Sequence, residues 1–319
     1  MKLPFAGRLL AVAVLAAASA ALPFSSALAA DAVAKPKVGL VMKSLANEFF
    51  VTMQDGAKVY QKDHAADFDM ITNGIKDETD TSAQIGIVKQ MILAKVNAIV
   101  IAPADSKALV KVLEDASKAG IKIVNIDNRL DPDVLKSKNL DIPFVGPDNR
   151  KGAKLVGDYL AKQLAAGDKV GIIEGVPTTT NAQQRTAGFK DAMDAAGMKI
   201  VSTQSGNWEI DQGQKVASAM LSEHPDLKAL LAGNDNMALG AVSAVRAAGK
   251  AGKVLVVGYD NIDAIKPMLQ DGRVLATADQ AAAQQAVFGI QNALKLIKGE
   301  KVDAKDGMIE TPVELVLKK

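Results

Sequence analysis

Acids and amides stand directly after short apolar runs at several places in the sequence. The clearest example is residues 122–129, in which a β-branched run ends in Asp127 and Asn128. The same arrangement recurs at residues 98–106, 142–149, 229–236, 254–261 and 274–280. Such runs are typical of strands buried on both faces, as in a parallel sheet covered by helices. Because ligands bind beyond the carboxyl ends of these strands, the sequence predicts one crevice lined by polar side chains.

Two roles are open to the strand-end residues. Asp and Asn are also preferred helix N-caps, so a polar residue between a strand and a helix can be purely structural. We assign this capping role to Asp105, Asp148 and Asp235. Asn234 and Asp260 each have a polar neighbour that could cap the helix instead, which makes these two candidates for the crevice.

The few aromatic residues supply a second set of candidates. The chain has eight Phe, three Tyr and one Trp. Phe50 fits the buried stripe of a predicted helix, whereas Phe49 lies off that stripe, beside the predicted crevice. Trp208 follows a strand in a loop rather than within a periodic apolar segment, which favours a functional placement. Flat aromatic faces on both sides of a polar crevice suit the apolar faces of a sugar ring.

Common enzyme signatures are missing from the sequence. There is no G-x-G-x-x-G after a strand, no G-x-x-x-x-G-K-[ST] and no G-x-S-x-G. The only histidines are His64 and His224, both expected at the surface, and there is no cysteine. Transition-metal sites and Ser-His or Cys-His nucleophiles are therefore not expected. We predict a protein that is not an enzyme and that needs neither cofactor nor metal.

The first 29 residues are predicted to form a cleaved signal peptide. Lys2 and Arg8 mark a basic start, residues 9–22 are apolar, and residues 27–29 give the small-x-small pattern of a cleavage site. The apolar run is shorter than the roughly 20 residues of a membrane span. Without cysteine the chain can carry neither a lipid-anchoring thiol nor a disulfide. We therefore expect a periplasmic protein without a lipid anchor.

Charge and length narrow the class further. The formal net charge is +2, and loss of Lys2 and Arg8 with the signal peptide leaves a neutral chain. A neutral surface argues against nucleic acid as a partner, because basic patches would be expected. The remaining chain of roughly 290 residues approaches the size at which one core divides into two domains.

Strand and helix patterns alternate from residue 37 onward, which predicts an α/β fold with doubly wound parallel sheets. About ten strand segments are many for one sheet and natural for two similar lobes. No low-complexity linker separates the halves, so several short crossings are expected instead of one tether. Residues 129–141 are rich in charge and interrupted by proline, and are expected to form a surface loop.

Seven stretches carry a family resemblance. They are NEFFVTMQDGA (47–57), IAPADS (101–106), NIDNR (125–129), RTAGF (185–189), NDNMALGA (234–241), VVGYDN (256–261) and ATADQ (276–280). In order and spacing the chain resembles the periplasmic pentose- and hexose-binding proteins of the ribose-binding type, from about residue 37 to residue 319. That family shares its fold with the effector domains of lactose-repressor-type regulators.

The resemblance implies ligand contacts from two lobes. On the first lobe the implied contacts are Asn47, Phe49, Phe50, Asp127 and Asn128. On the second lobe they are Arg185, Trp208, Asn234, Tyr259 or its neighbour Asp260, and Gln280. The sequence departs from the ribose-binding pattern at three of these positions, with Asn128 in place of Arg, Trp208 in place of Phe and Tyr259 in place of Phe.

The resemblance also implies a three-crossing hinge, as in type I periplasmic binding proteins. The expected N-terminal lobe comprises residues 30–147 and 281–312, and the expected C-terminal lobe comprises residues 148–280 and 313–319. The crossings are expected near residues 147–149, 280–282 and 311–313.

The expected function is capture of a small neutral sugar or sugar alcohol for delivery to an ABC importer permease. Phe49 and Trp208 would sandwich the ring, while Asp127, Asp260 and Arg185 would bond its hydroxyls. The protein is expected to be a monomer, with a chemoreceptor as a further candidate partner. A transcription regulator would need a DNA-binding segment where the signal peptide stands. A receptor for a furanosyl autoinducer or for a chemotaxis ligand remains an alternative.

Overall fold

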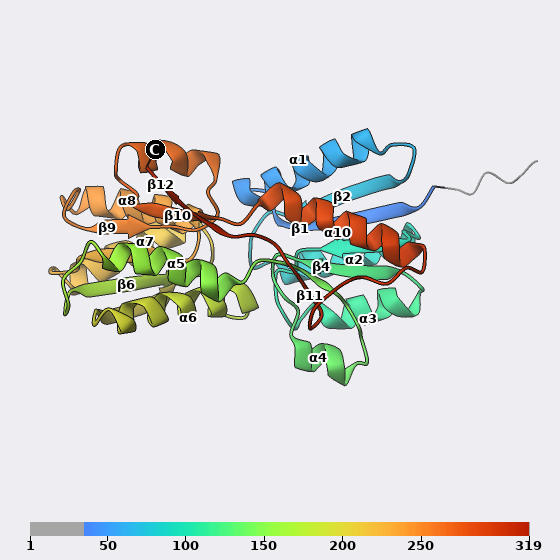
Figure 1. Ribbon diagram of the computed structural model, residues 1–319, viewed down its shortest axis with the longest axis horizontal. Coiled ribbons are helices and arrows are strands. Elements are labelled where there is room, and N and C mark those ends of the chain that lie inside the picture. The colour runs from blue at the N-terminus through green and yellow to red at the C-terminus, as the bar shows by residue number, and fades with distance from the viewer. Residues whose placement is uncertain (1–34, 319) are drawn as a thin grey trace, which may run out of the picture. The chain divides into compact units, whose positions relative to one another are not determined.

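The computed structural model describes residues 35–318, which lie in one unit of the chain and contain two six-stranded sheets (Figure 1). The predicted signal peptide lies outside these residues. Within residues 35–318, no helix combines the length and the apolar character that crossing a membrane requires.

The two sheets have the same plan. Sheet A has the strand order β11-β5-β4-β3-β1-β2, and sheet B has the order β12-β10-β9-β8-β6-β7. All neighbouring strands are parallel except β12, which is antiparallel to β10. The predicted fold, two doubly wound parallel-sheet lobes, is therefore confirmed.

The strand bounds are as follows. Sheet A consists of β1 (Lys37–Ser44), β2 (Asp69–Ile75), β3 (Ala98–Ile101), β4 (Lys122–Ile126), β5 (Phe144–Gly146) and β11 (Met308–Glu310). Sheet B consists of β6 (Lys169–Glu174), β7 (Lys199–Ser205), β8 (Ala229–Ala232), β9 (Leu255–Val257), β10 (Ala276–Asp279) and β12 (Glu314–Leu317). The central strands β3 and β8 are buried along their whole length, because helices cover both faces.

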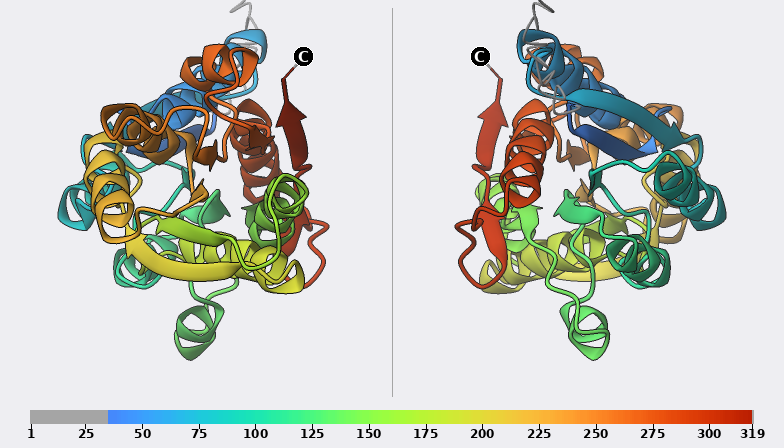
Figure 2. Two further views of the ribbon diagram at one scale, coloured as in Figure 1. Left: turned by 90° about the vertical axis from the view of Figure 1, so that its left-hand side faces the viewer. Right: turned by 90° about the vertical axis from the view of Figure 1, so that its right-hand side faces the viewer.

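Helices flank each sheet on both sides. They are α1 (Glu48–Asp63), α2 (Thr81–Leu93), α3 (Val110–Lys118), α4 (Pro132–Ser137), α5 (Asn149–Ala161), α6 (Thr180–Ala195), α7 (Ile210–Glu223), α8 (Asp235–Ala247), η1 (Asp263–Ile265), α9 (Lys266–Gln270) and α10 (Ala282–Ile297). On sheet A, α1 and α10 pack side by side on one face and α2 and α3 on the other. On sheet B, α5 and α6 cover one face, drawn in green and olive-yellow in Figure 2, and α7 and α8 cover the other, drawn in yellow to orange.

The chain passes between the sheets three times. It leaves sheet A after β5 and enters α5, which packs on sheet B. It returns after β10 into α10, which packs on β3 and β4. It crosses a last time between β11 and β12, which are edge strands of different sheets. We call the three connecting segments, residues 147–148, 280–281 and 311–313, the crossings.

Two local predictions need correction. Residues 129–141 are not all loop, because Pro132–Ser137 forms the short helix α4. The Asp131 carboxylate caps this helix by accepting from the backbone N–H groups of Asp133 and Val134. Pro132 stands in the first turn, where proline fits without losing a hydrogen bond, so it starts a helix here.

The strand β11 was not predicted, because its apolar stretch is only three residues long.

Candidate ligand-binding site

A small cavity lies where the carboxyl ends of the two sheets face each other. Its lining residues are Lys43, Asn47, Phe49, Phe50, Glu78 and Asp127 on the side of sheet A, and Asn181, Arg185, Trp208, Asn234, Asp260 and Gln280 on the side of sheet B. The free volume left between these side chains is only about 10 Å³, roughly the room for one water molecule. A sugar can therefore enter only if the side chains or the two sides of the cavity move apart.

The structure brings together all the predicted contact residues except Asn128 and Tyr259. Both exceptions are completely buried next to the cavity, but their side chains bond or pack elsewhere. Three lining residues were missed by the sequence reasoning, namely Lys43, Glu78 and Asn181.

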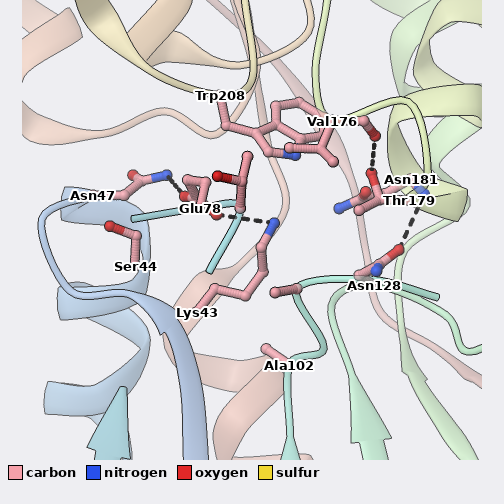
Figure 3. Close-up of polar contacts among 12 residues, drawn as sticks. Lys43, Ser44, Asn47, Glu78, Ala102, Asn128, Val176, Thr179, Asn181 and Trp208 are labelled. Carbon is pink, nitrogen blue, oxygen red and sulfur yellow. Dashed lines mark hydrogen bonds and ion pairs between the residues drawn. The ribbon is translucent and has the colours of Figure 1, made fainter. Parts of the chain in front are cut away.

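The Asn128 side chain links the loop after β3 to the start of α6. Its Nδ2 donates to the Pro103 carbonyl at 2.9 Å. Its Oδ1 accepts from the Asn181 backbone N–H at 3.3 Å, as Figure 3 shows. A further contact at 3.3 Å comes from Ser106 Oγ. The amide is therefore occupied within the protein, and the structure does not present it to a ligand.

Tyr259 supports the site from behind. The Arg185 guanidinium carbon lies 3.8 Å from the centre of the Tyr259 ring, a close cation–π contact. Among the described residues its hydroxyl has no hydrogen-bond partner. Of the two alternatives that the resemblance left open, Asp260 lines the cavity and Tyr259 does not.

The missed residues Lys43 and Glu78 form a buried ion pair. The Lys43 Nζ lies 3.0 Å from Glu78 Oε2, and both side chains are almost fully buried. Asn47 Nδ2 donates to the other Glu78 oxygen at 2.9 Å (Figure 3). The Lys43 ammonium also lies 5.3 Å from the Phe50 ring centre and 5.4 Å from that of Trp208. Lys43 had a signal, a charge inside an otherwise apolar strand, whereas Glu78 stands in a polar loop that gave none.

The first turn of α1 supplies one aromatic wall. Asn47 caps the helix, because its Oδ1 accepts from the Phe49 backbone N–H at 3.1 Å. This cap places Phe49 and Phe50 at the helix start, with their rings edge to face and 5.1 Å apart. Both rings are buried and line the cavity.

Asp127 is a buried acid aimed at the cavity. Its backbone is left-handed, with φ 61°, and its Oδ2 has no hydrogen-bond partner in the described structure. Burial raises the pKa of the carboxyl to about 6, although Lys43 and Arg185 oppose the shift. Strained backbone is often kept at functional sites, and an acceptor without a partner here suits a ligand hydroxyl.

Arg185 and Asp260 form the opposite wall. Arg185 Nη1 donates to Asp260 Oδ1 at 3.2 Å and to the Gly233 carbonyl at 2.9 Å. Gln280 Nε2 donates to the same Asp260 oxygen at 2.7 Å. Burial raises the pKa of Asp260 to about 7, while the positive charge of Arg185 acts in the opposite direction.

Trp208 supplies the second aromatic wall. Its backbone is left-handed, with φ 69°, and its carbonyl accepts from Asn234 Nδ2 at 3.2 Å. The indole lies so close to Gly175 that a Cβ on that glycine would be 2.0 Å from a ring atom. The indole Nε1–H is buried and has no acceptor among the described residues. The ring therefore offers both a flat face and a donor.

Two of the three predicted capping roles are wrong. Asp148 caps α5 as predicted, by accepting from the Lys151 backbone N–H. Asp105 does not cap α3, whose N-cap is Leu109, and instead accepts from two backbone N–H groups in the turn before that helix. At α8 the cap is Asn234, which accepts from the Met237 backbone N–H at 2.9 Å.

Asp235, the residue expected to cap α8, is instead fully buried. Its carboxylate accepts from Thr277 Oγ1 at 2.8 Å and from the Ile262 backbone N–H at 3.1 Å. Burial raises the pKa of this carboxyl well above its ordinary value, and the nearby Asp260 adds to the shift. Asp235 thus holds the segment that carries Asp260.

Hydrogen bonds join the two sides around the cavity. They run from Thr180 N to Ser106 Oγ at 2.9 Å, from Glu78 N to Glu209 Oε1 at 3.3 Å and from Asp263 N to Glu48 Oε1 at 2.6 Å. Each bond links an element of sheet A with an element of sheet B. The cavity is therefore closed on several sides by direct contacts.

The arrangement can bind several hydroxyl groups around one small ring. Carboxylates and amides surround the space, and aromatic rings from both sides bound it. Within residues 35–318 no group of three or more His, Cys, Asp or Glu side chains is placed to hold a metal ion. His64 and His224 lie at the C-terminal ends of α1 and α7, away from the cavity.

Sequence comparison identifies related proteins along nearly the whole chain. Residues 38–301 match the family described as the periplasmic binding protein domain. The chain is 72% identical to the D-ribose/D-allose-binding protein of Pseudomonas aeruginosa, over 99% of both chains. It is 31% identical to the ribose import binding protein of Escherichia coli K12, over 95% of this chain and 97% of the relative.

Solved structures show the same similarity. A solute-binding protein of an ABC transporter from Burkholderia multivorans is 74% identical, with a TM-score of 0.85, and the match covers 88% of this chain and 99% of the other. That protein holds an unknown ligand built as alpha-D-erythrofuranose. A protein of the same class from Actinobacillus succinogenes, with bound D-allose, is 37% identical with a TM-score of 0.83, over 89% and 98% of the chains.

Proposed function

Because the chain belongs to the periplasmic binding protein family, we propose that it captures a neutral aldose in the cavity between its lobes. It then presents this sugar to the permease of an ABC importer. The observation that carries the proposal is the buried Asp127 carboxylate, which has an oxygen without a partner and faces a cavity with aromatic walls.

The charges in the cavity favour a neutral ligand. Each cation already has an acid beside it, since Lys43 pairs with Glu78 at 3.0 Å and Arg185 pairs with Asp260 at 3.2 Å. The remaining acid, Asp127, needs hydrogen-bond donors rather than a countercharge alone. Hydroxyl groups supply such donors, and a hydrogen bond to a charged group contributes about 1.5–3 kcal/mol.

The relatives named above point to D-ribose and D-allose as the ligands to test first. In the pyranose form D-allose repeats the ring hydroxyl arrangement of D-ribose and adds a hydroxymethyl group. The cavity adds the Lys43–Glu78 pair to the contacts predicted by the resemblance, among which Trp208 supplies a wide indole face. We propose that D-allose binds at least ~10-fold more tightly than D-ribose, a difference of about 1.4 kcal/mol.

We also propose where the protein works and in which form. Residues 1–29 act as a cleaved leader, and the mature protein works in the periplasm without a lipid anchor and as a monomer. The proposal that no lipid is attached is supported by the sequence, which has no cysteine to carry one.

A calorimetric panel of aldoses, ketoses and alditols on the purified chain tests the ligand proposal. D-allose is expected at the top of the ranking, and the recovered sugar should be chemically unchanged, as in a carrier. Trp208, the only tryptophan of the chain, gives an independent fluorescence readout at the site. No binding of any aldose at millimolar concentration would refute the proposed function, and D-ribose as the tightest ligand would refute the ranking.

A further inference from the structure

Two buried amide side chains outside the cavity wall hold residues that line it. Gln285 bonds Gln280, and Asn149 bonds Arg185. We propose that Gln285 and Asn149 are positioning residues, which orient the Arg185–Asp260 pair for the sugar and tie that pair to two of the crossings. The inference rests on the proposed function, because it concerns the same site.

Gln285 determines which way the Gln280 amide faces. Gln285 Nε2 donates to the Gln280 backbone carbonyl at 2.8 Å and to Gln280 Oε1 at 3.3 Å. Because a donor stands on that side, the oxygen of the Gln280 amide faces Gln285 and its NH₂ group faces away. The NH₂ group then donates to Asp260 Oδ1 at 2.7 Å.

The orientation of Gln280 matters because Asp260 is a buried acid. Asp260 Oδ1 accepts from both Gln280 and Arg185, at 2.7 Å and 3.2 Å, and Oδ2 makes neither bond. A reversed Gln280 amide would place an oxygen against this carboxylate and remove one of its two donors. Gln285 thus keeps the Asp260 carboxylate fixed, with its second oxygen left for a ligand hydroxyl.

Asn149 acts on the other partner of the pair. Its Oδ1 accepts from Arg185 Nε at 2.8 Å, and the residue is 2% exposed. Together with the Gly233 carbonyl and the Tyr259 ring, this bond fixes the plane of the guanidinium. The N–H donors of the planar guanidinium must keep one orientation to bond both Asp260 and a ligand. Asn149 fixes that orientation without contacting the ligand itself.

Asn149, and Gln280 to which Gln285 donates, stand where the chain passes between the sheets. Asn149 is the first residue after the crossing at residues 147–148, and Gln280 belongs to the crossing that ends in Ala281, whose φ is 55°. Gln285 lies on α10, which packs on sheet A, whereas Asp260 follows β9 of sheet B. A change in the angle between the lobes therefore moves Gln285 relative to Gln280 and Asp260.

Gln285 is tested by a double-mutant cycle. The variants are Gln285→Met, Gln280→Met and the double variant, with Gln284→Met as the matched control, because Gln284 is an exposed glutamine on the same helix. The dissociation constant of the tightest sugar in the panel is measured by calorimetry and by Trp208 fluorescence. The melting temperature without ligand is recorded for each variant.

If Gln285 acts through Gln280, Gln285→Met weakens binding about tenfold and Gln284→Met leaves it unchanged. The double variant is then no weaker than Gln280→Met, because one interaction has been removed twice. An affinity of Gln285→Met within about twofold of the control overturns the inference. So does a fold-loss of affinity in the double variant that equals the product of the two single-variant losses, because the two residues would then act independently. Should Gln285→Met not fold, Gln285→Ala takes its place, since it removes the amide without adding bulk.

Asn149 is tested in the same way against Arg185. Asn149→Ala should weaken binding about tenfold in the wild-type background. In an Arg185→Lys background, which lacks Nε, it should cost nothing further. A full additional loss in that background overturns the Asn149 half of the inference. Sugar binding by the wild-type chain tests the proposed function separately, so the two failures are distinguishable.

Discussion

The Lys43 ammonium lies 3.0 Å from the Glu78 carboxylate at the centre of the cavity, and neither side chain is more than 2% exposed. Taking two charges out of water is costly, and the pair is stable only because each charge compensates the other. Asn47, the N-cap of α1, donates to the other oxygen of Glu78. The Glu78 carboxylate is therefore held by Lys43 of β1 and by the residue that starts α1. The pair thus combines a structural role with a place in the proposed sugar site.

Removal of Lys43 should destabilise the unliganded chain. Lys43→Met leaves the Glu78 carboxylate buried without its cation, which costs about 3–5 kcal/mol. The double variant Lys43→Met/Glu78→Gln should regain most of that free energy of unfolding but not the sugar affinity. Denaturant titration and calorimetry measure the two quantities, with Lys35→Met at the exposed Lys35–Asp69 pair as the control. Equal stability of Lys43→Met and wild type would contradict the prediction.

Sugar affinity should fall as pH decreases from 8 to 5. Asp127 and Asp260 have pKa values raised to about 6 and about 7 by burial, and their ionised forms accept hydrogen bonds from hydroxyls. The charged groups that face them are Lys43, Arg185 and Glu78. Each unit of pH below a pKa lowers the ionised fraction about tenfold. Calorimetry across this range measures the effect, and a flat profile would show that neither acid binds the sugar in its ionised form.

The stability of the unliganded chain should change in the opposite direction. The pKa of Asp127 is higher in the folded chain than in the unfolded chain, so between about pH 4 and pH 6 the folded chain binds more protons. The contribution of Asp127 to the free energy of unfolding is therefore greatest at low pH and is lost as pH rises through this window. The difference between wild type and Asp127→Asn, which cannot titrate, isolates this contribution. A difference that grows in favour of wild type with rising pH would reverse the assigned sign.

Gly175→Ala should displace the Trp208 indole. The new Cβ would lie 2.0 Å from a ring atom, which no real contact permits. Affinity should fall by on the order of tenfold or more, and the emission of Trp208 should shift because the ring moves. Gly86→Ala is the control, since its Cβ meets nothing within 4 Å. Unchanged emission and affinity in Gly175→Ala would show that the indole is not held by this glycine.

Sugar binding should close the lobes. The contacts from Glu48 to the start of η1 and from Ser106 to Thr180 join the two sides, so they can form only when the lobes are together. Solution scattering should therefore give a smaller radius of gyration with saturating sugar than without it. Glu48→Gln and Ser106→Ala should reduce this difference. Identical scattering curves for the wild-type chain in both conditions would count against closure.

The strand ends could be predicted from the sequence because the geometry of parallel sheets is regular. Once a buried strand is recognised, the polar residue after it must lie at the carboxyl edge, and Asp127, Asp260 and Gln280 follow this rule. Helical periodicity alone did not separate Phe49 from Phe50, because both rings are buried and line the cavity. Relatives with bound sugars agree with the predicted ligand class, and the comparisons give no support to an autoinducer receptor.

The missed features depend on backbone turns that leave no periodic signal. Asp127 is left-handed, so the chain turns sharply there, and the next side chain, Asn128, bonds Pro103 instead of facing the cavity. Asn234 rather than Asp235 caps α8, a choice of one residue that the pair Asn-Asp leaves undecided. Glu78 reaches the cavity from an irregular loop, and only its contacts with Lys43 and Asn47 reveal that position.

The last two strands, β11 and β12, belong to different sheets although three residues separate them in the chain. During synthesis, sheet A therefore waits for its edge strand and for the helix α10 that covers β3 and β4 until all of sheet B except β12 has been made. Sheet B receives its own edge strand only three residues after β11. The N-terminal half of the chain thus cannot complete sheet A by itself, and both sheets acquire their last strands within the same short stretch.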